Sequence, residues 1–126
     1  MNYTIRMGIP EMEELWHDLQ QKHRAGTAQK DEERLYSKWG KALKLLSLDP
    51  FYQSLRTHEI PPLTARYGLR VWQSYLENQK SGAMRMFWIY GPAQQEITII
   101  GLEPHPEDKK KGAYTRIPLS DLPPIK

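Results

Sequence analysis

The sequence contains no cysteine, which excludes disulfide bonds and thiolate metal sites. It has no apolar run of about 20 residues, the length that a membrane-spanning helix requires. Its opening stretch, MNYTIRMGIPEMEEL, lacks the apolar core of a signal peptide. No histidine belongs to an HExxH-like pattern, which argues against a zinc site. We therefore expect a cytoplasmic protein that has no metal and no other cofactor.

A chain of 126 residues suits a single domain, and no internal repeat divides it. Residues 1–126 are expected to form that domain, with a proline-punctuated tail from about residue 115. The formal net charge of +3 is mildly basic. Between residues 50 and 102 there are five Arg or Lys residues and three acidic residues, so the excess positive charge lies toward the second half. This balance permits a polyanionic partner but does not require one.

The first half of the chain predicts one strand and two helices. Tyr3, Ile5 and Met7 alternate with other residues, as in a short strand. A helix is expected to begin at Pro10, where the missing N–H is harmless, and to end near Gly26. Thr27 can cap a second helix, which ends at the sequence Asp-Pro. The apolar stripe of this second helix consists of Leu35, Trp39, Ala42, Leu43 and Leu46.

The second half predicts mainly strands. Residues 51–67 contain two consecutive prolines and are expected to be irregular, apart from a short helical turn at residues 52–56. Three runs rich in β-forming residues follow, LRVWQSYLE, AMRMFWIYG and EITIIGLE, joined by short turn-like links. The expected fold is α+β: an N-terminal strand, an antiparallel helical hairpin, and a three-stranded antiparallel meander packed on the helices.

Arg85 is the cation that most needs an explanation, because it interrupts an apolar strand. One interpretation is an edge-strand charge that discourages sheet stacking. The other is an anion-binding group held on a rigid strand. Trp72 and Trp88 present a similar choice between packing in the core and stacking on nucleic acid bases.

The stretch GLEPHPEDKKKGAY follows the last predicted strand. It combines an imidazole (His105), three ammonium groups (Lys109, Lys110 and Lys111) and a phenol (Tyr114). A lysine run is usually a solvated loop, and a lone loop histidine usually has no special role. Together with Arg85, however, these groups are the types that cleave an RNA phosphodiester without a metal.

The order of elements and the runs AMRMFW, IIGLEPH and KKKGAY resemble the bacterial type II toxins of the RelE/ParE superfamily. The resemblance covers about residues 3–114. The RelE branch cleaves mRNA on the ribosome and is held inactive by an antitoxin protein, whereas the ParE branch inhibits DNA gyrase. The resemblance therefore implies an endoribonuclease toxin whose partners are an antitoxin, mRNA and the ribosome.

The resemblance also implies roles for particular residues. Arg85 matches the arginine that grips the scissile phosphate, and Tyr114 matches a tyrosine that stacks on or activates the nucleotide. His105 matches the histidine general acid of some members, and Glu77 matches a glutamate base. Arg70 and the lysines at positions 109, 110 and 111 are expected to bind RNA. Two alternatives stay open on the same fold: a ParE-like inhibitor of gyrase and a non-catalytic RNA-binding module.

Overall fold

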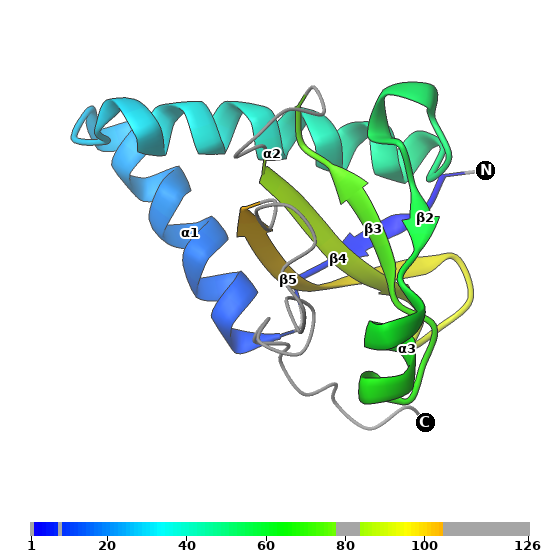
Figure 1. The fold of residues 1–126 in the computed structure, drawn as a ribbon. Helices are drawn as coiled ribbons and strands as arrows, with labels where there is room; N and C mark the ends of the chain where they lie inside the picture. Colours follow the sequence, from blue (N-terminus) through cyan, green and yellow to red (C-terminus); the bar gives the residue numbers. More distant parts are fainter. Residues whose placement is uncertain (1, 8, 78–83, 105–126) are drawn as a thin grey trace.

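The computed structural model describes residues 2–7, 9–77 and 84–104, and within these ranges the protein has the expected α+β class, with a five-stranded mixed sheet in place of the expected three-stranded meander (Figure 1). The elements in chain order are β1 (Thr4–Arg6), α1 (Pro10–Ala25), α2 (Lys30–Leu48), the 3₁₀ helix η1 (Gln53–Leu55), β2 (His58–Glu59), α3 (Pro61–Tyr67), β3 (Trp72–Tyr75), β4 (Met84–Tyr90) and β5 (Glu96–Pro104).

The strands form one mixed sheet in the order β1-β5-β4-β3-β2. β1 runs parallel to β5, and each of the other neighbouring pairs is antiparallel. β4 therefore occupies the middle of the sheet. The short strand β2 and the helix α3 are elements that the sequence analysis did not expect.

The ends of α1 follow from local chemistry. Pro10 occupies the start of the helix, Glu11 and Glu13 lie in its first turn, and Lys22, His23 and Arg24 lie in its last turn. This charge order suits the helix dipole. Gly26 closes the helix with a left-handed conformation at φ 72°, which costs glycine little.

The start of α2 corrects the prediction for Thr27. The N-cap is Gln29, whose side chain accepts from the backbone N–H of Glu32, while the Glu32 carboxylate accepts from the Gln29 backbone N–H. This reciprocal pair satisfies two donors that a Thr27 cap would have left for other partners. The predicted end is confirmed, because the helix stops at Leu48, just before Asp49 and Pro50.

The prediction that residues 51–67 are irregular was wrong for the second half of that range. Pro61 and Pro62 begin α3 instead of breaking it, because the first helical turn needs no N–H from them. Gly68 ends the helix in a left-handed conformation at φ 92°. Leu63 anchors α3 in the core and is fully buried.

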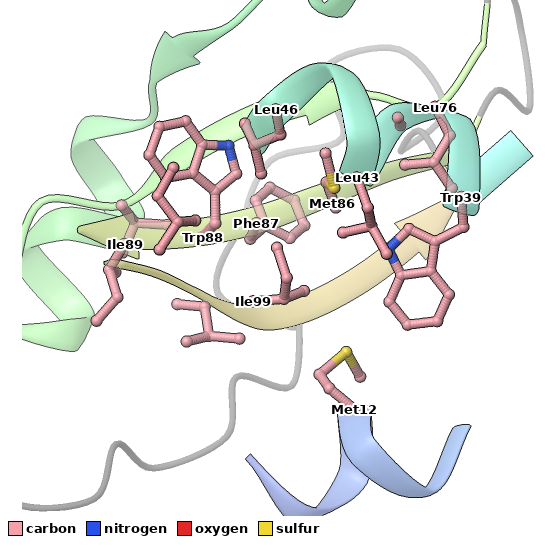
Figure 2. Packing of buried hydrophobic residues seen from close by; sticks show 14 of the residues in the cluster. Met12, Trp39, Leu43, Leu46, Leu76, Met86, Phe87, Trp88, Ile89 and Ile99 are labelled. Carbon is pink, nitrogen blue, oxygen red and sulfur yellow. The ribbon is translucent and has the colours of Figure 1, made fainter. Parts of the chain in front are cut away.

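The core forms where the two long helices meet the sheet. Figure 1 shows α1 and α2 diverging from their connection, and α1 contacts β5 while α2 contacts β1. Figure 2 shows Leu43 and Leu46 of α2 beside Met86 of β4, with Trp39 next to them. No helix in the described ranges is long and apolar enough to span a membrane.

Candidate functional site

Arg85 lies in the interior of the sheet, and this position overturns the edge-strand interpretation. It belongs to β4, which has hydrogen-bonded neighbours on both sides. Its side chain is completely buried, so it cannot act as a solvated charge at a sheet edge. A buried cation is costly unless other groups replace its water shell.

Two of the described side chains, both on the same face of the sheet, contact the guanidinium group. Its Nη1 donates a hydrogen bond to Oε1 of Gln73, which is also buried. Its central carbon lies 5.0 Å from the centre of the Phe87 ring, within the range of a cation–π contact. Gln73 and Phe87 stand opposite each other on β3 and β4. The two contacts fix the orientation of the arginine on a rigid strand.

A row of three polar groups crosses the sheet at Arg85. Tyr75 of β3 stands opposite Arg85 on one side, and Glu103 of β5 stands opposite it on the other. Directly opposed residues on neighbouring strands point to the same face. The strand register thus places a phenol, a guanidinium and a carboxyl at neighbouring positions on three strands.

Burial raises the pKa of the Glu103 carboxyl above its ordinary value, and the positive charge of Arg85 acts in the opposite direction. A carboxyl with a raised pKa is better able to take up and release a proton near neutral pH. Sequence analysis missed both Glu103 and Gln73. Both residues lie in the predicted strands that neighbour the run containing Arg85, and this was the feature of the sequence that could have identified them.

The structure does not place Glu77 in this row. Glu77 follows β3, and its carboxylate Oε1 accepts from Nη2 of Arg34 in α2 at 2.7 Å. The Glu77 side chain is 12% exposed, whereas that of Arg34 is 58% exposed. The contact ties the end of β3 to α2.

Arg70 also lies apart from Arg85. It pairs with Glu59 at 3.0 Å and covers the Trp72 ring at 4.8 Å. Arg85 and Phe87 share one face of β4, whereas Trp88 and its partner Trp72 lie on the other face. Because Arg70 lies over the Trp72 ring, it is on the face opposite to Arg85. Arg70 is the more accessible of the two, with 68% of its side chain exposed.

The two tryptophans pack against each other and not on an open surface. Trp88 is fully buried and donates from Nε1 to the Ser74 hydroxyl at 2.9 Å. The Trp72 ring stacks on it with the ring centres 5.9 Å apart. Core packing is therefore the interpretation that the structure supports for Trp88.

The remaining predicted site residues are His105, Lys109, Lys110, Lys111 and Tyr114, and all five lie outside the described residues. Their convergence with Arg85 stays a prediction. Within the described ranges, no group of three or more His, Asp or Glu side chains is arranged to hold a metal ion.

Comparison of the chain with known protein families, with curated proteins and with solved structures finds no match. The function must therefore be argued from the residues themselves.

The raised pKa of Glu103 predicts a pH dependence of stability. A carboxyl that holds its proton more tightly when folded favours the folded state below its unfolded pKa, and this contribution is lost as the pH rises through the folded pKa. The window opens near the ordinary value of 4.5 and extends upward. Over that window, the free energy of unfolding of Glu103→Gln should rise relative to the parent protein. Urea midpoints measured from about pH 2 to pH 8 would check this and would also cover the range below pH 4.5 in which the control variant responds.

Glu59→Gln provides a control of opposite sign. Hydrogen bonds from Arg70 and Thr64 lower the pKa of Glu59, so its carboxylate stabilises the fold above pH 4.5 and loses that effect as the pH falls. The Glu59→Gln variant should lose stability relative to the parent as the pH rises toward 4.5. Identical trends for the two variants would contradict the assignment of Glu103.

Proposed function

We propose that this protein is a RelE-like toxin that cleaves mRNA on the ribosome. The observation that carries the proposal is Arg85, a guanidinium held on a central strand between a phenol and a carboxyl with a raised pKa. The arrangement of the elements adds support, since two long helices accompany a sheet in which β3, β4 and β5 follow one another in antiparallel order. The finer assignment to the RelE/ParE fold is part of the proposal.

The proposed chemistry is attack of a ribose 2′-OH on the adjacent phosphate. The O2′–P bond forms, the P–O5′ bond breaks, and a 2′,3′-cyclic phosphate and a free 5′-OH result. A base removes the 2′ proton, and an acid protonates the leaving 5′ oxygen. Arg85 would stabilise the charge that develops on the phosphoryl oxygens, with no metal required.

Proton transfer is assigned to a small set of groups. Glu103 is the described carboxyl nearest in register to Arg85, and its raised pKa suits it to the exchange of a proton. His105 as the acid, Tyr114 as a stacking group and Glu77 as a base remain part of the proposal from the resemblance. The Arg34 contact makes Glu77 the weaker of the two glutamate candidates.

Because the Arg85 side chain has no exposed surface, RNA can reach it only after neighbouring groups move. The proposal therefore requires a conformational change on binding. A ribosome-dependent enzyme satisfies this requirement, since contacts with the ribosome can supply the energy of the rearrangement. Weak activity on naked RNA is the expected consequence.

The test is to induce the protein in a bacterium and to map the 5′ ends of cellular mRNA. The proposal expects new cleavage sites in translated regions and arrested growth, both relieved by Arg85→Ala. A gene for a small antitoxin beside this one would agree with that outcome. Growth arrest with intact mRNA and a DNA damage response would instead indicate the ParE-like inhibitor of gyrase.

The complete burial of Arg85 favours a second candidate, a non-catalytic RNA-binding module. In that case the guanidinium stabilises the sheet through Gln73 and Phe87, and the exposed cations bind RNA. No growth phenotype, together with salt-sensitive RNA binding that survives substitution of Arg85, would identify this function.

A further inference from the structure

A pocket of about 220 Å³ lies between α2, η1 and the end of β3. Arg34, Lys38 and Lys41 line it from α2. Their spacing of four and then three residues places all three on one face of the helix. The pocket is thus lined on one side by a stripe of positive charge.

This stripe is only partly neutralised. Glu77 is the one acidic residue among the described residues that line the pocket, and it pairs with Arg34. Among the described residues, no ion pair engages Lys38 or Lys41. Three positive charges against one negative charge leave a net charge of about +2 at the mouth of the pocket. Like charges one helical turn apart repel one another, so the arrangement costs stability until an anion binds.

The rest of the lining suits a ligand that is not purely ionic. Leu45 of α2 and Leu55 of η1 provide apolar surface, and Leu55 is almost completely buried. Ser54 and Tyr75 also line the pocket. A hydroxyl can donate to an anionic oxygen, and an aromatic ring can pack on a flat ligand. The pocket therefore offers both a charged rim and an apolar wall.

The size of the pocket narrows the class of ligand. A volume of 220 Å³ is room for several water molecules. This is larger than a phosphate group needs and smaller than a drug-sized ligand fills. A phosphate group that carries part of a ring system matches both the volume and the two kinds of surface.

We propose that this pocket binds the phosphate of a nucleotide, with Lys38 and Lys41 as the principal phosphate ligands and the apolar wall against the sugar or base. The nucleotide is either a free mononucleotide or one residue of an RNA strand. Tyr75 lines the pocket and also stands opposite Arg85, so the two regions are one strand apart. The inference does not depend on RNA cleavage.

The test is a titration of the full chain with adenosine 5′-monophosphate, followed by NMR of the backbone amides. We expect saturable shifts at Ser54, Leu55 and Leu76, and no comparable shifts with adenosine, which lacks the phosphate. Each of Lys38→Ala and Lys41→Ala should weaken the affinity about tenfold, the effect of losing one charge-assisted hydrogen bond. Neither variant should lower the unfolding midpoint.

Lys44→Ala is the matched control, because Lys44 is an exposed lysine of the same helix that does not line the pocket. It should leave the affinity unchanged. A short single-stranded oligoribonucleotide distinguishes the two sources: much tighter binding than that of the mononucleotide indicates RNA, and equal binding indicates a free nucleotide. The proposal is overturned if adenosine binds equally well, if Lys44→Ala weakens binding as much as Lys38→Ala, or if only an acidic peptide such as hexaglutamate binds.

Discussion

Replacement of Trp39 by alanine is expected to lower the free energy of unfolding by about 3–5 kcal/mol, the usual cost of removing a large aromatic side chain from a core. Trp39 is fully buried on the inner face of α2. Its ring meets the edge of Trp16 in α1 with the centres 5.2 Å apart. It therefore holds the two long helices together. Against a typical total stability of about 5–15 kcal/mol, this loss is enough to unfold a marginal domain.

Trp39→Phe separates packing from hydrogen bonding in the same position. The Trp39 Nε1 is buried and has no hydrogen-bond partner among the described residues. Phenylalanine removes this unsatisfied donor and keeps much of the aromatic surface, so its cost should be well below that of alanine. Urea unfolding followed by circular dichroism measures both variants. Equal destabilisation by phenylalanine and alanine would show that the Trp39 Nε1 donates a hydrogen bond to a group outside the described residues.

The buried stripe of α2 was predictable because helical periodicity is a local property. Trp39, Ala42, Leu43 and Leu46 recur at helical spacing, and all four are buried. Segments whose structure depends on context were harder to predict. Two consecutive prolines can end regular structure or begin a helix. Here the burial of Leu63 in the core favours the helix α3, and this contact cannot be seen in the local sequence. The N-cap of α2 was similarly ambiguous, because Thr27 and Gln29 are only two positions apart and each has a side chain that can accept a hydrogen bond.

The partner of Arg85 could not be predicted, because a β-bulge changes the register. Tyr90 pairs with Ile97 and Trp88 pairs with Ile99, and simple continuation of that hairpin would put Leu102 opposite Arg85. The register shifts between Phe87 and Trp88, which puts Glu103 there instead. One extra residue in β5 thus exchanges an apolar neighbour for a carboxyl. No local sequence pattern specified the position of that bulge.

The five-stranded order of the sheet could not be predicted from alternation alone either. The pattern of the run AMRMFW shows which side chains share a face, but it does not show how many strands flank it. The sheet order depends on β5 pairing with β1, a contact between segments about 90 residues apart in the sequence. β3 and β5 flank β4 without that contact, so the expected meander already placed Arg85 on an inner strand, but it did not show that the side chain is completely buried.

If Arg85 is buried for the sake of catalysis and not of stability, its replacement by an apolar residue should cost little free energy of unfolding. The double variant Arg85→Met/Glu103→Gln removes the charges of two residues that stand opposite each other and leaves an apolar chain beside Phe87. Replacement of buried charges by apolar groups of similar size is often neutral or stabilising. The substitution also leaves the buried Oε1 of Gln73 without its donor, so we expect the free energy of unfolding to fall by no more than about 1–3 kcal/mol. We also expect a fall in the rate of mRNA cleavage on programmed ribosomes of about 10²–10³-fold, as when one transition-state donor is lost.

Arg85→Lys supplies the matched comparison, because it keeps the positive charge and removes the planar fork that binds phosphate oxygens in pairs. Its cleavage rate should fall between those of the parent and the double variant, measured in single-turnover reactions with saturating protein. If the double variant is strongly destabilised, Arg85 and Glu103 are a structural pair. If it is stable and still cleaves mRNA at the parental rate, the phosphate-binding role of Arg85 is wrong. The proposal expects a double variant that is stable and inactive. In that case the two charges contribute little to the stability of the fold, and their catalytic role explains why they are present.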